Sequence, residues 1–407
     1  MSPPDKKRKT SSTTRKEPSL KKHNKKPSLV LPPTTQSAIT NPSLPDDVLV
    51  SCLALVSRVY YPSLSLVSKS FRSLLASPEL YKTRSSIGHA ESCLYVCLRF
   101  HPDPNPRWFT LCMKPDRVLT KDNIKKKKQK KKKSSGYVLA KIPASHSPPA
   151  RSSGLVTIGS DIYNIGGDMN HEPSSSVSIL DCRTHTWREG PSMLVKRIYT
   201  HANVLDGKIY VAGYGKAKES SSSDLMEVFD PKTQTWELVS RCSGGELGDI
   251  SYIHSSAAID RKVYIFAGSN DLAYEPRECR WERVGTKMTC VWSSNCVIEN
   301  VLYQQNDGKF EWYDTNARLW RTLKGVVGLP KFARSTARLA DYGGRMAVLW
   351  DKVVASPGDT KKVIWCAVIA LERRNSDEIW GKVQWRDVVL TVPTSCDVQY
   401  ALAATVC

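Results

Sequence analysis

The sequence predicts a mostly β protein made of repeated four-stranded units, preceded by a small helical domain and a basic tail. An aspartate followed six residues later by a tryptophan recurs three times after residue 150, each time with an apolar residue before the aspartate. Short runs of Val, Ile and Tyr alternate there with Gly, Asp, Asn and Ser clusters, a pattern typical of strands and turns. Before residue 90, apolar residues instead recur at helical spacing.

Residues 1–40 form the predicted basic tail. Ser, Thr, Pro and Lys dominate it, and its few apolar residues cannot offset the chain entropy lost on folding. Residues 1–26 hold ten Lys or Arg and two acids, and residues 121–133 hold nine Lys and one acid, so these segments carry most of the net charge of +21. We expect both to be disordered, the second as a Lys-rich insertion over 121–135. Residues 4–9 form a cluster of the type read by nuclear import receptors, and both import and its absence remain open.

A small helical domain is predicted over residues 41–87. Pro45 suits a first helical turn, because its missing N–H would have no intrahelical partner there. Asp46 and Asp47 follow where the helix dipole favours negative charge. One apolar stripe at helical spacing then covers residues 48–56.

A second apolar segment over residues 64–75 follows a break expected near residues 60–62, and we expect Pro78 to end it. Two or three short helices result. They carry more apolar positions than such a small domain can bury, so we expect an exposed apolar surface that binds a partner.

The β region is built from units that each contain a strand with a tyrosine. These residues recur 47, 54 and 39 positions apart, at Tyr163, Tyr210, Tyr264 and Tyr303. A period near 45 residues with four strands per unit is what the blades of a β-propeller require. We identify five units, which start near Ile162, Ile209, Val263, Val301 and Met346.

Closure of the propeller requires one more set of strands. Strands predicted over residues 94–100 and 107–112 precede the five units, and residues 400–406 read as a last strand. An open propeller would expose strand edges, so we expect these three strands to form a composite sixth blade. Five blades are the alternative.

Two stretches of the chain resemble known families. Residues 43–85, with Leu44-Pro45-Asp46-Asp47 and the run from Leu66 to Leu75, resemble the F-box. Residues 154–325, with Ile165-Gly166-Gly167 and the Asp…Trp spacing, resemble kelch repeats. Because the F-box precedes the kelch repeats, the chain is similar to the plant family of F-box/kelch-repeat proteins.

The resemblance implies a non-catalytic substrate receptor of an SCF-type (Skp–cullin–F-box) ubiquitin ligase. The F-box would bind the Skp adaptor, and through it the cullin, while a kelch propeller over residues 92–407 would bind an unidentified target protein for ubiquitination. The adaptor contacts carried over are Leu44, Pro45, Val48, Leu49, Leu53, Leu66, Val67, Ser68, Phe71 and Leu74. Phe71 stands where many F-boxes have Trp.

Contacts to the target are expected in propeller loops, because loops vary freely in length and chemistry. The preferred loops cover residues 168–176, 214–223 and 270–278, beginning at Asp168, Tyr214 and Asn270. The recurring tryptophans, in contrast, are expected to pack between blades: Trp187, Trp236, Trp281 and Trp320.

Other classes of function have less support. A copper-oxidase propeller would need clustered His and Tyr ligands, but the spacing of His171, His185 and His201 suits strand ends and turns. No nucleophile elbow, phosphate loop or paired-carboxylate signature occurs, so we expect no enzyme, cofactor or metal site. The lysine runs lack interleaved aromatics, so they offer nucleic acid only non-specific, salt-sensitive attraction. A kelch scaffold without ligase function stays open.

Cysteine usage and hydropathy indicate the cellular location. The twelve cysteines are scattered without a Cys-x-x-Cys pair, which is typical of buried free thiols in a reducing compartment. No apolar stretch approaches the roughly 20 residues that span a bilayer, and the N-terminus has no apolar signal core. We therefore expect a soluble intracellular protein, in the nucleus, the cytoplasm or both, with no membrane partner.

Overall fold

The computed structural model describes residues 44–103, 105–114, 135–144, 147–150, 152–166, 172–214, 225–239, 253–268, 271–284, 295–333, 336–356 and 359–407. The chain divides into two compact units, Met1–Leu44 and Pro45–Cys407, and only Leu44 of the first lies within these ranges. The predicted tail and most of the predicted Lys-rich insertion lie outside the described residues. Within them, no single helix is long and apolar enough to cross a membrane, and residues 46–55 and 58–64 reach that length only as a pair bent by 110°.

The second unit begins with a helical domain. Its elements are α1 (Asp46–Leu55), the 3-10 helix η1 (Arg58–Tyr60), α2 (Tyr61–Leu64), α3 (Lys69–Leu75) and α4 (Pro78–Ser86). Serines begin the last two helices: the Ser68 hydroxyl accepts from the Phe71 N–H at 3.0 Å, and the Ser77 hydroxyl from the Leu80 N–H at 3.3 Å. Such caps contribute about 1 kcal/mol each, so the two serines define where α3 and α4 begin.

Two predictions about this domain are wrong. The break expected near residues 60–62 is helical; the chain is instead extended at Val56 and Ser57, after α1, and α2 is followed by a turn before α3 begins at Lys69. Pro78 does not end the second segment; α3 already ends at Leu75, and Pro78 is the first residue of α4, where a missing N–H costs no hydrogen bond. Residues 44–87 therefore contain four α-helices and a 3-10 helix rather than two or three helices.

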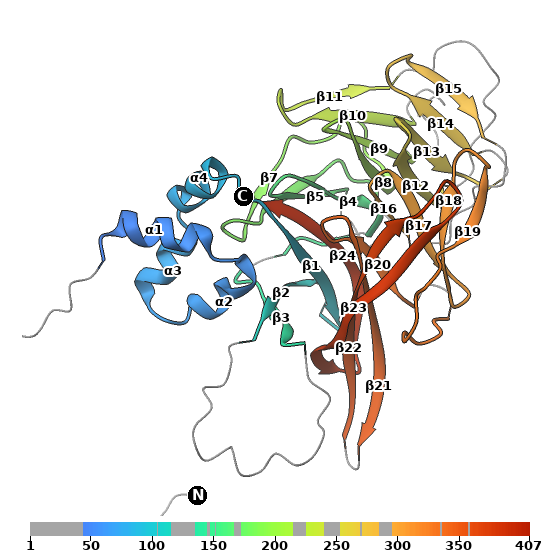
Figure 1. Ribbon diagram of the computed structural model, residues 1–407. Coiled ribbons are helices and arrows are strands. Elements are labelled where there is room, and N and C mark those ends of the chain that lie inside the picture. The colour runs from blue at the N-terminus through green and yellow to red at the C-terminus, as the bar shows by residue number, and fades with distance from the viewer. Residues whose placement is uncertain are drawn as a thin grey trace, which may run out of the picture. The chain divides into compact units, whose positions relative to one another are not determined.

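Six four-stranded antiparallel sheets follow, and each is one blade of a propeller (Figure 1). Blades 1 to 3 contain β4 (Leu155–Ile158), β5 (Asp161–Ile165), β6 (Val177–Asp181) and β7 (Thr186–Glu189); β8 (Ile198–Leu205), β9 (Lys208–Tyr214), β10 (Met226–Asp230) and β11 (Thr235–Leu238); β12 (Ser255–Ile259), β13 (Lys262–Phe266), β14 (Leu272–Glu275) and β15 (Arg280–Arg283). Blades 4 to 6 contain β16 (Asn295–Ile298), β17 (Val301–Asn306), β18 (Lys309–Asp314) and β19 (Leu319–Thr322); β20 (Arg338–Asp341), β21 (Arg345–Ser356), β22 (Asp359–Arg373) and β23 (Ile379–Pro393); β24 (Cys396–Val406), β1 (Glu91–Phe100), β2 (Arg107–Met113) and β3 (Tyr137–Lys141).

The first strands of the six blades close a ring around the centre. Each of β4, β8, β12, β16, β20 and β24 contacts the next, and β24 contacts β4. The last strand, β24, pairs with β1 from Glu91↔Val406 to Phe100↔Cys396, which joins the two ends of the propeller in one sheet. The composite sixth blade is confirmed, and so are the five repeat units, whose predicted starts lie in β5, β9, β13, β17 and β21.

The Asp…Trp repeat marks the turn between the third and fourth strands of a blade. In blade 1, an Asp181 carboxylate oxygen accepts from the Arg183 N–H at 2.8 Å, and His185 takes a left-handed conformation with φ 58°. The chain thereby reverses so that Trp187 pairs with Leu180, the apolar residue before the aspartate. The same geometry recurs in blades 2 and 4 at Asp230, Gln234 and Trp236, and at Asp314, Arg318 and Trp320.

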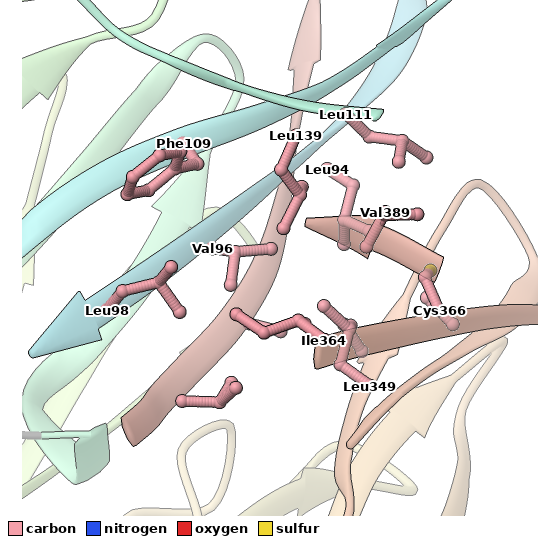
Figure 2. Packing of buried hydrophobic residues seen from close by; sticks show 14 of the residues in the cluster. Leu94, Val96, Leu98, Phe109, Leu111, Leu139, Leu349, Ile364, Cys366 and Val389 are labelled. Atoms are coloured by element: carbon pink, nitrogen blue, oxygen red, sulfur yellow. The ribbon is translucent and has the colours of Figure 1, made fainter. Parts of the chain in front are cut away.

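Apolar side chains fill the space between neighbouring blades. Figure 2 shows one such cluster, in which Leu94, Val96 and Leu98 of β1 lie opposite Leu349 and Ile364 of blade 5. The four recurring tryptophans take part in equivalent clusters with the preceding blade, as predicted: Trp187, Trp236, Trp281 and Trp320.

Candidate adaptor-docking surface

The helical domain has a small core of its own. Val50, Leu53 and Ala54 of α1 pack with Leu80 of α4 and with Tyr61, each less than a tenth exposed. Leu75 of α3 completes this cluster, and Phe71 and Leu74 pack against it from the same helix. Of the apolar stripe predicted on α1, only Leu53 lies in this core, with Val56 packed against it, and Val50 and Ala54 provide the rest of the buried face.

Large apolar side chains of the same domain nevertheless face solvent. Val48 is 40% exposed, Leu66 74% and Val67 64%, and the last two lie in the turn between α2 and α3. Pro45 is also exposed, and Leu44, in the first unit, is 56% exposed. Leaving such side chains in water costs free energy, so the exposure of several of them on one small domain favours a partner site.

The predicted contacts thus differ in how accessible they are to a partner. Leu53 is only 5% exposed and belongs to the domain's core, so it is not available to a partner. Ser68 caps α3, which gives it a structural role whatever else it contacts. Leu49, Phe71 and Leu74 are half-buried. The sequence did not single out three further exposed apolar residues, because they lie off the predicted stripes: Leu55, Tyr60 and Ile87.

A buried arginine fastens the helices to one another. The Arg84 side chain is fully buried and donates to the carbonyl oxygens of Ala54 and Val56, at 3.0 and 2.9 Å, and to the Tyr61 hydroxyl at 3.1 Å. It also donates to the Glu91 carboxylate at 2.9 Å. A buried cation is tolerated only when it is paired and hydrogen-bonded, so these groups have to stay together.

A second arginine joins the helical domain to the propeller. The Arg58 guanidinium donates to the Tyr81 hydroxyl at 2.9 Å and to the carbonyl oxygen of Cys182, in the turn after β6, at 2.7 Å. Its backbone N–H donates to Glu91, the first residue of β1, at 2.7 Å. Glu91 therefore binds both arginines, and the helical domain is attached to blades 1 and 6. Sequence reasoning missed this joint, since its members are up to 124 residues apart.

Burial controls protonation around this joint. It raises the pKa of the Tyr81 and Tyr61 hydroxyls, an effect that Arg58 and Arg84 oppose, so both tyrosines stay neutral hydrogen-bond donors. Burial, together with the nearby Arg58, lowers the pKa of His185 to about 3. The His185 ring lies within hydrogen-bond distance, 3.1 Å, of the Tyr95 hydroxyl, so this turn is built around a neutral imidazole.

Acid is therefore expected to destabilise the joint through His185. Since the folded pKa is about 3 and the unfolded pKa is about 6.5, the unfolded chain binds an extra proton as pH falls below 6.5. Stability is full above that pH and falls by up to about 1.4 kcal/mol per pH unit on the way down. In unfolding titrations from pH 7 to 4.5, His185→Asn should lose less stability than the wild type, because asparagine tolerates the left-handed conformation without titrating. Parallel pH profiles of the two proteins would contradict this.

The predicted target-binding loops follow strands that finish at the other end of the propeller. Glu91 starts β1 and Cys182 follows β6, so the helical domain contacts the end where second strands begin and third strands finish. The second strands β5, β9 and β13, which precede the predicted loops, finish at the opposite end. Asp168 and Asn270 are outside the described residues, and Tyr214 is the last residue of β9.

One of these predicted loops is shorter than expected. Residues 272–275 form β14, so most of the range 270–278 is a strand and the turn after it rather than one free loop. Of the three histidines considered as ligands, His201 lies buried in β8, His185 belongs to the joint, and His171 is outside the described ranges. Within those ranges, no group of three or more His, Cys, Asp or Glu side chains could hold a metal ion.

Comparison with known proteins agrees with this two-part architecture. The F-box domain family matches residues 42–83, and the family described as FKB95, Kelch-repeats domain, matches residues 108–390. The chain is 61% identical to F-box/kelch-repeat protein At4g39550 of Arabidopsis thaliana, over all of both chains. It is 54% identical to F-box/kelch-repeat protein At4g39570 of the same plant, over 90% of this chain and 92% of that one, and 50% identical to F-box/kelch-repeat protein At4g39580, over 93% and 96%. This protein belongs to the F-box/kelch-repeat family.

Proposed function

We propose that this chain is the substrate-recognition subunit of an SCF-type ubiquitin ligase. Its F-box binds a Skp-type adaptor, and through it a cullin, while its propeller holds a protein target for ubiquitination. The chain itself contributes binding and orientation rather than catalysis. Membership of the F-box/kelch-repeat family supports this role.

The observation that carries the proposal is the exposure of Val48, Leu66 and Val67 on the F-box. Burial of Leu66 and Val67 by a partner would contribute about 3–6 kcal/mol, enough to account for much of a stable complex. The joint through Arg58 and Glu91 adds to the argument. It attaches the F-box to the propeller by hydrogen bonds rather than by a free linker, which suits a protein that presents one partner to another.

The test is adaptor binding by variants of the exposed turn. Leu66→Asp or Val67→Asp should weaken binding of a purified Skp-type adaptor by about 10- to 100-fold, since each removes one apolar side chain from the interface and buries a charge in its place. Calorimetry on the full chain gives the affinity.

Val327→Asp provides the matched control, because Val327 is 78% exposed but lies in the propeller. This variant should bind the adaptor like the wild type. Equal affinities for Leu66→Asp, Val67→Asp and the control would remove the ligase assignment and leave a kelch scaffold.

We also propose that the protein works inside the cell, with the basic cluster at residues 4–9 directing part of it to the nucleus. Replacing Lys6, Lys7, Arg8 and Lys9 by alanine in a fluorescent fusion should shift the protein toward the cytoplasm. An unchanged distribution would exclude this cluster as the import signal.

A further inference from the structure

Three strands of blade 5, β21, β22 and β23, are far longer than those of the preceding blades, and the second and third strands, β21 and β22, form a long hairpin. Strands β21 and β22 have 12 and 15 residues, whereas β13 and β17, the second strands of the two preceding blades, have five and six. Since β21 is a second strand and β22 a third strand, the two extend from the end of the propeller opposite the F-box joint. Figure 1 shows β21 running well past the end of β20.

The outer half of β21 has an open edge. Strand β20 pairs with β21 only from Met346 to Leu349, and the residues beyond Leu349 pair with β22 alone. Among the described residues, no other backbone group bonds to 351–355. These residues are also accessible: 352–355 are all exposed, with Val353 at 54% and Val354 at 43%.

The register identifies which backbone groups face the open edge. The Tyr342 N–H donates to the Arg345 carbonyl at 2.7 Å, so Arg345 is hydrogen-bonded to the β20 side of the sheet. Because hydrogen-bonded pairs alternate along an antiparallel ladder, Asp351, Val353 and Ala355 direct their N–H and C=O groups to the same side, beyond the end of β20. Lys352 and Val354 bond to β22 instead. An unpaired strand of this kind is a template for another strand.

Charge indicates what kind of chain fits. Lys352 lies on the exposed stretch, on the same face of the sheet as Val354. On the other face, the Asp351 carboxylate is paired with Lys362 at 3.1 Å, and Lys362 also binds Asp397 at 2.9 Å, so Asp351 is held in an ion pair on that face. An incoming strand therefore meets a lysine and two valines.

The chain's own segments fit this edge poorly. Residues 1–26 and 121–133 are both strongly basic and would be repelled by Lys352. A second copy of β21 would place one Lys352 near the other, and edge lysines are a device that proteins use against such pairing. An acidic segment of a different protein matches the charge, and β-branched residues in it would match the valines.

We propose that residues 351–355 of β21 bind an extended acidic segment of the target protein as an added β-strand. Backbone groups of Asp351, Val353 and Ala355 supply the hydrogen bonds, Lys352 meets a carboxylate, and the two valines contact alternate apolar side chains. This recognition mode rests on the proposed receptor function, since it assigns part of the target site at the propeller end away from the F-box.

A displayed library of random peptides about eight residues long, selected on the full chain bound to its Skp-type adaptor, tests the proposal. We expect enrichment of peptides that alternate Asp or Glu with Val, Ile or Thr. Their affinity should fall at least about tenfold for Val353→Pro, which removes an edge-facing N–H but no bond to β22. Val353→Thr keeps that N–H and the β-branched shape, so it is the matched control and should bind like the wild type. Lys352→Glu should reverse the charge preference of the selected peptides.

The following results would contradict the binding of an acidic strand at this edge. Selected peptides that bind Val353→Pro as well as the wild type would overturn it, and so would a failure to enrich acidic peptides. Dimerisation of the wild type that Val353→Pro abolishes would assign the edge to a second copy instead. If Val353→Pro lowers the melting temperature, the charge reversal by Lys352→Glu, together with N-methylation of alternate peptide amides, decides the question. If the wild-type chain binds the adaptor but no acidic peptide, only this inference fails. If the free wild-type chain binds acidic peptides but not the adaptor, only the receptor assignment fails.

Discussion

Glu227→Ala is expected to lower the free energy of unfolding by about 3–5 kcal/mol, because it breaks a buried ion pair on one side only. The side chains of Glu227 and Arg197 are both completely buried, and the Arg197 Nε donates to the Glu227 carboxylate at 2.9 Å. Glu227 also accepts from the backbone N–H groups of Leu194 and Val195, at 2.7 and 3.1 Å. Without the carboxylate, a guanidinium stays in the interior and the connection between blades 1 and 2 loses two hydrogen bonds.

Two further variants separate this explanation from simple loss of packing. The double variant Arg197→Met, Glu227→Leu removes both charges and should recover much of the lost stability, since apolar replacements of buried pairs are often tolerated. Arg188→Ala breaks the exposed pair with Asp161, at 2.7 Å, and should cost no more than about 1 kcal/mol. Denaturant unfolding followed by tryptophan fluorescence measures all three. A Glu227→Ala loss no larger than that of Arg188→Ala would show that the buried pair does not hold these blades.

Local chemistry made the regular blades predictable from the sequence. Asp181, Asp230 and Asp314 each form the same turn with their own following residues, so the signal lies within a few positions of the chain. The strand that closes the propeller was predictable for a different reason. An unpaired edge is unfavourable, and residues 400–406 were the remaining apolar stretch.

Long-range features were not predictable in the same way. Blade 5 departs from the regular pattern because its strands carry register shifts between Ile364 and Trp365 and between Val368 and Ile369, which break the alternation of apolar and polar residues. The Arg58 joint depends on Glu91 and Cys182, and nothing local to an arginine indicates such partners. Pro78 was interpreted as a helix end because proline permits both a start and a stop. Only the Ser77 cap distinguishes the two.

The candidate docking surface falls between these cases. Helical periodicity identified Val48 and Leu53 equally well, but it could not say which one faces the domain's own core. That choice is made by α4, which packs on α1 and begins only at Pro78. Leu66 and Val67 are exposed because they lie between helices rather than on one. The prediction of one continuous apolar segment over residues 64–75 missed this turn.

Removal of β24 is expected to abolish cooperative folding of the propeller. A chain that ends at Ser395 loses the whole ladder between β24 and β1, and β24 is also the member of the inner ring that joins β20 to β4. Three of its buried side chains, Val398, Leu402 and Val406, contribute about 5–9 kcal/mol by burial alone. That is comparable with the whole stability of a typical domain, about 5–15 kcal/mol. Circular dichroism and thermal unfolding should show loss of the cooperative transition, together with aggregation through the exposed edge of β1.

A chain that ends at Val406 is the matched control, because it lacks only Cys407 and keeps every register pair of β24. It should unfold like the full chain. A synthetic peptide of residues 396–407 added to the chain ending at Ser395 should restore the transition in a concentration-dependent way, since binding only the folded state stabilises it by mass action. If the truncated chain unfolds cooperatively at the wild-type midpoint, the six-bladed ring does not depend on its last strand. Restoration by the peptide would show instead that the two ends of the propeller are held together by this ladder, and not by the connections between blades.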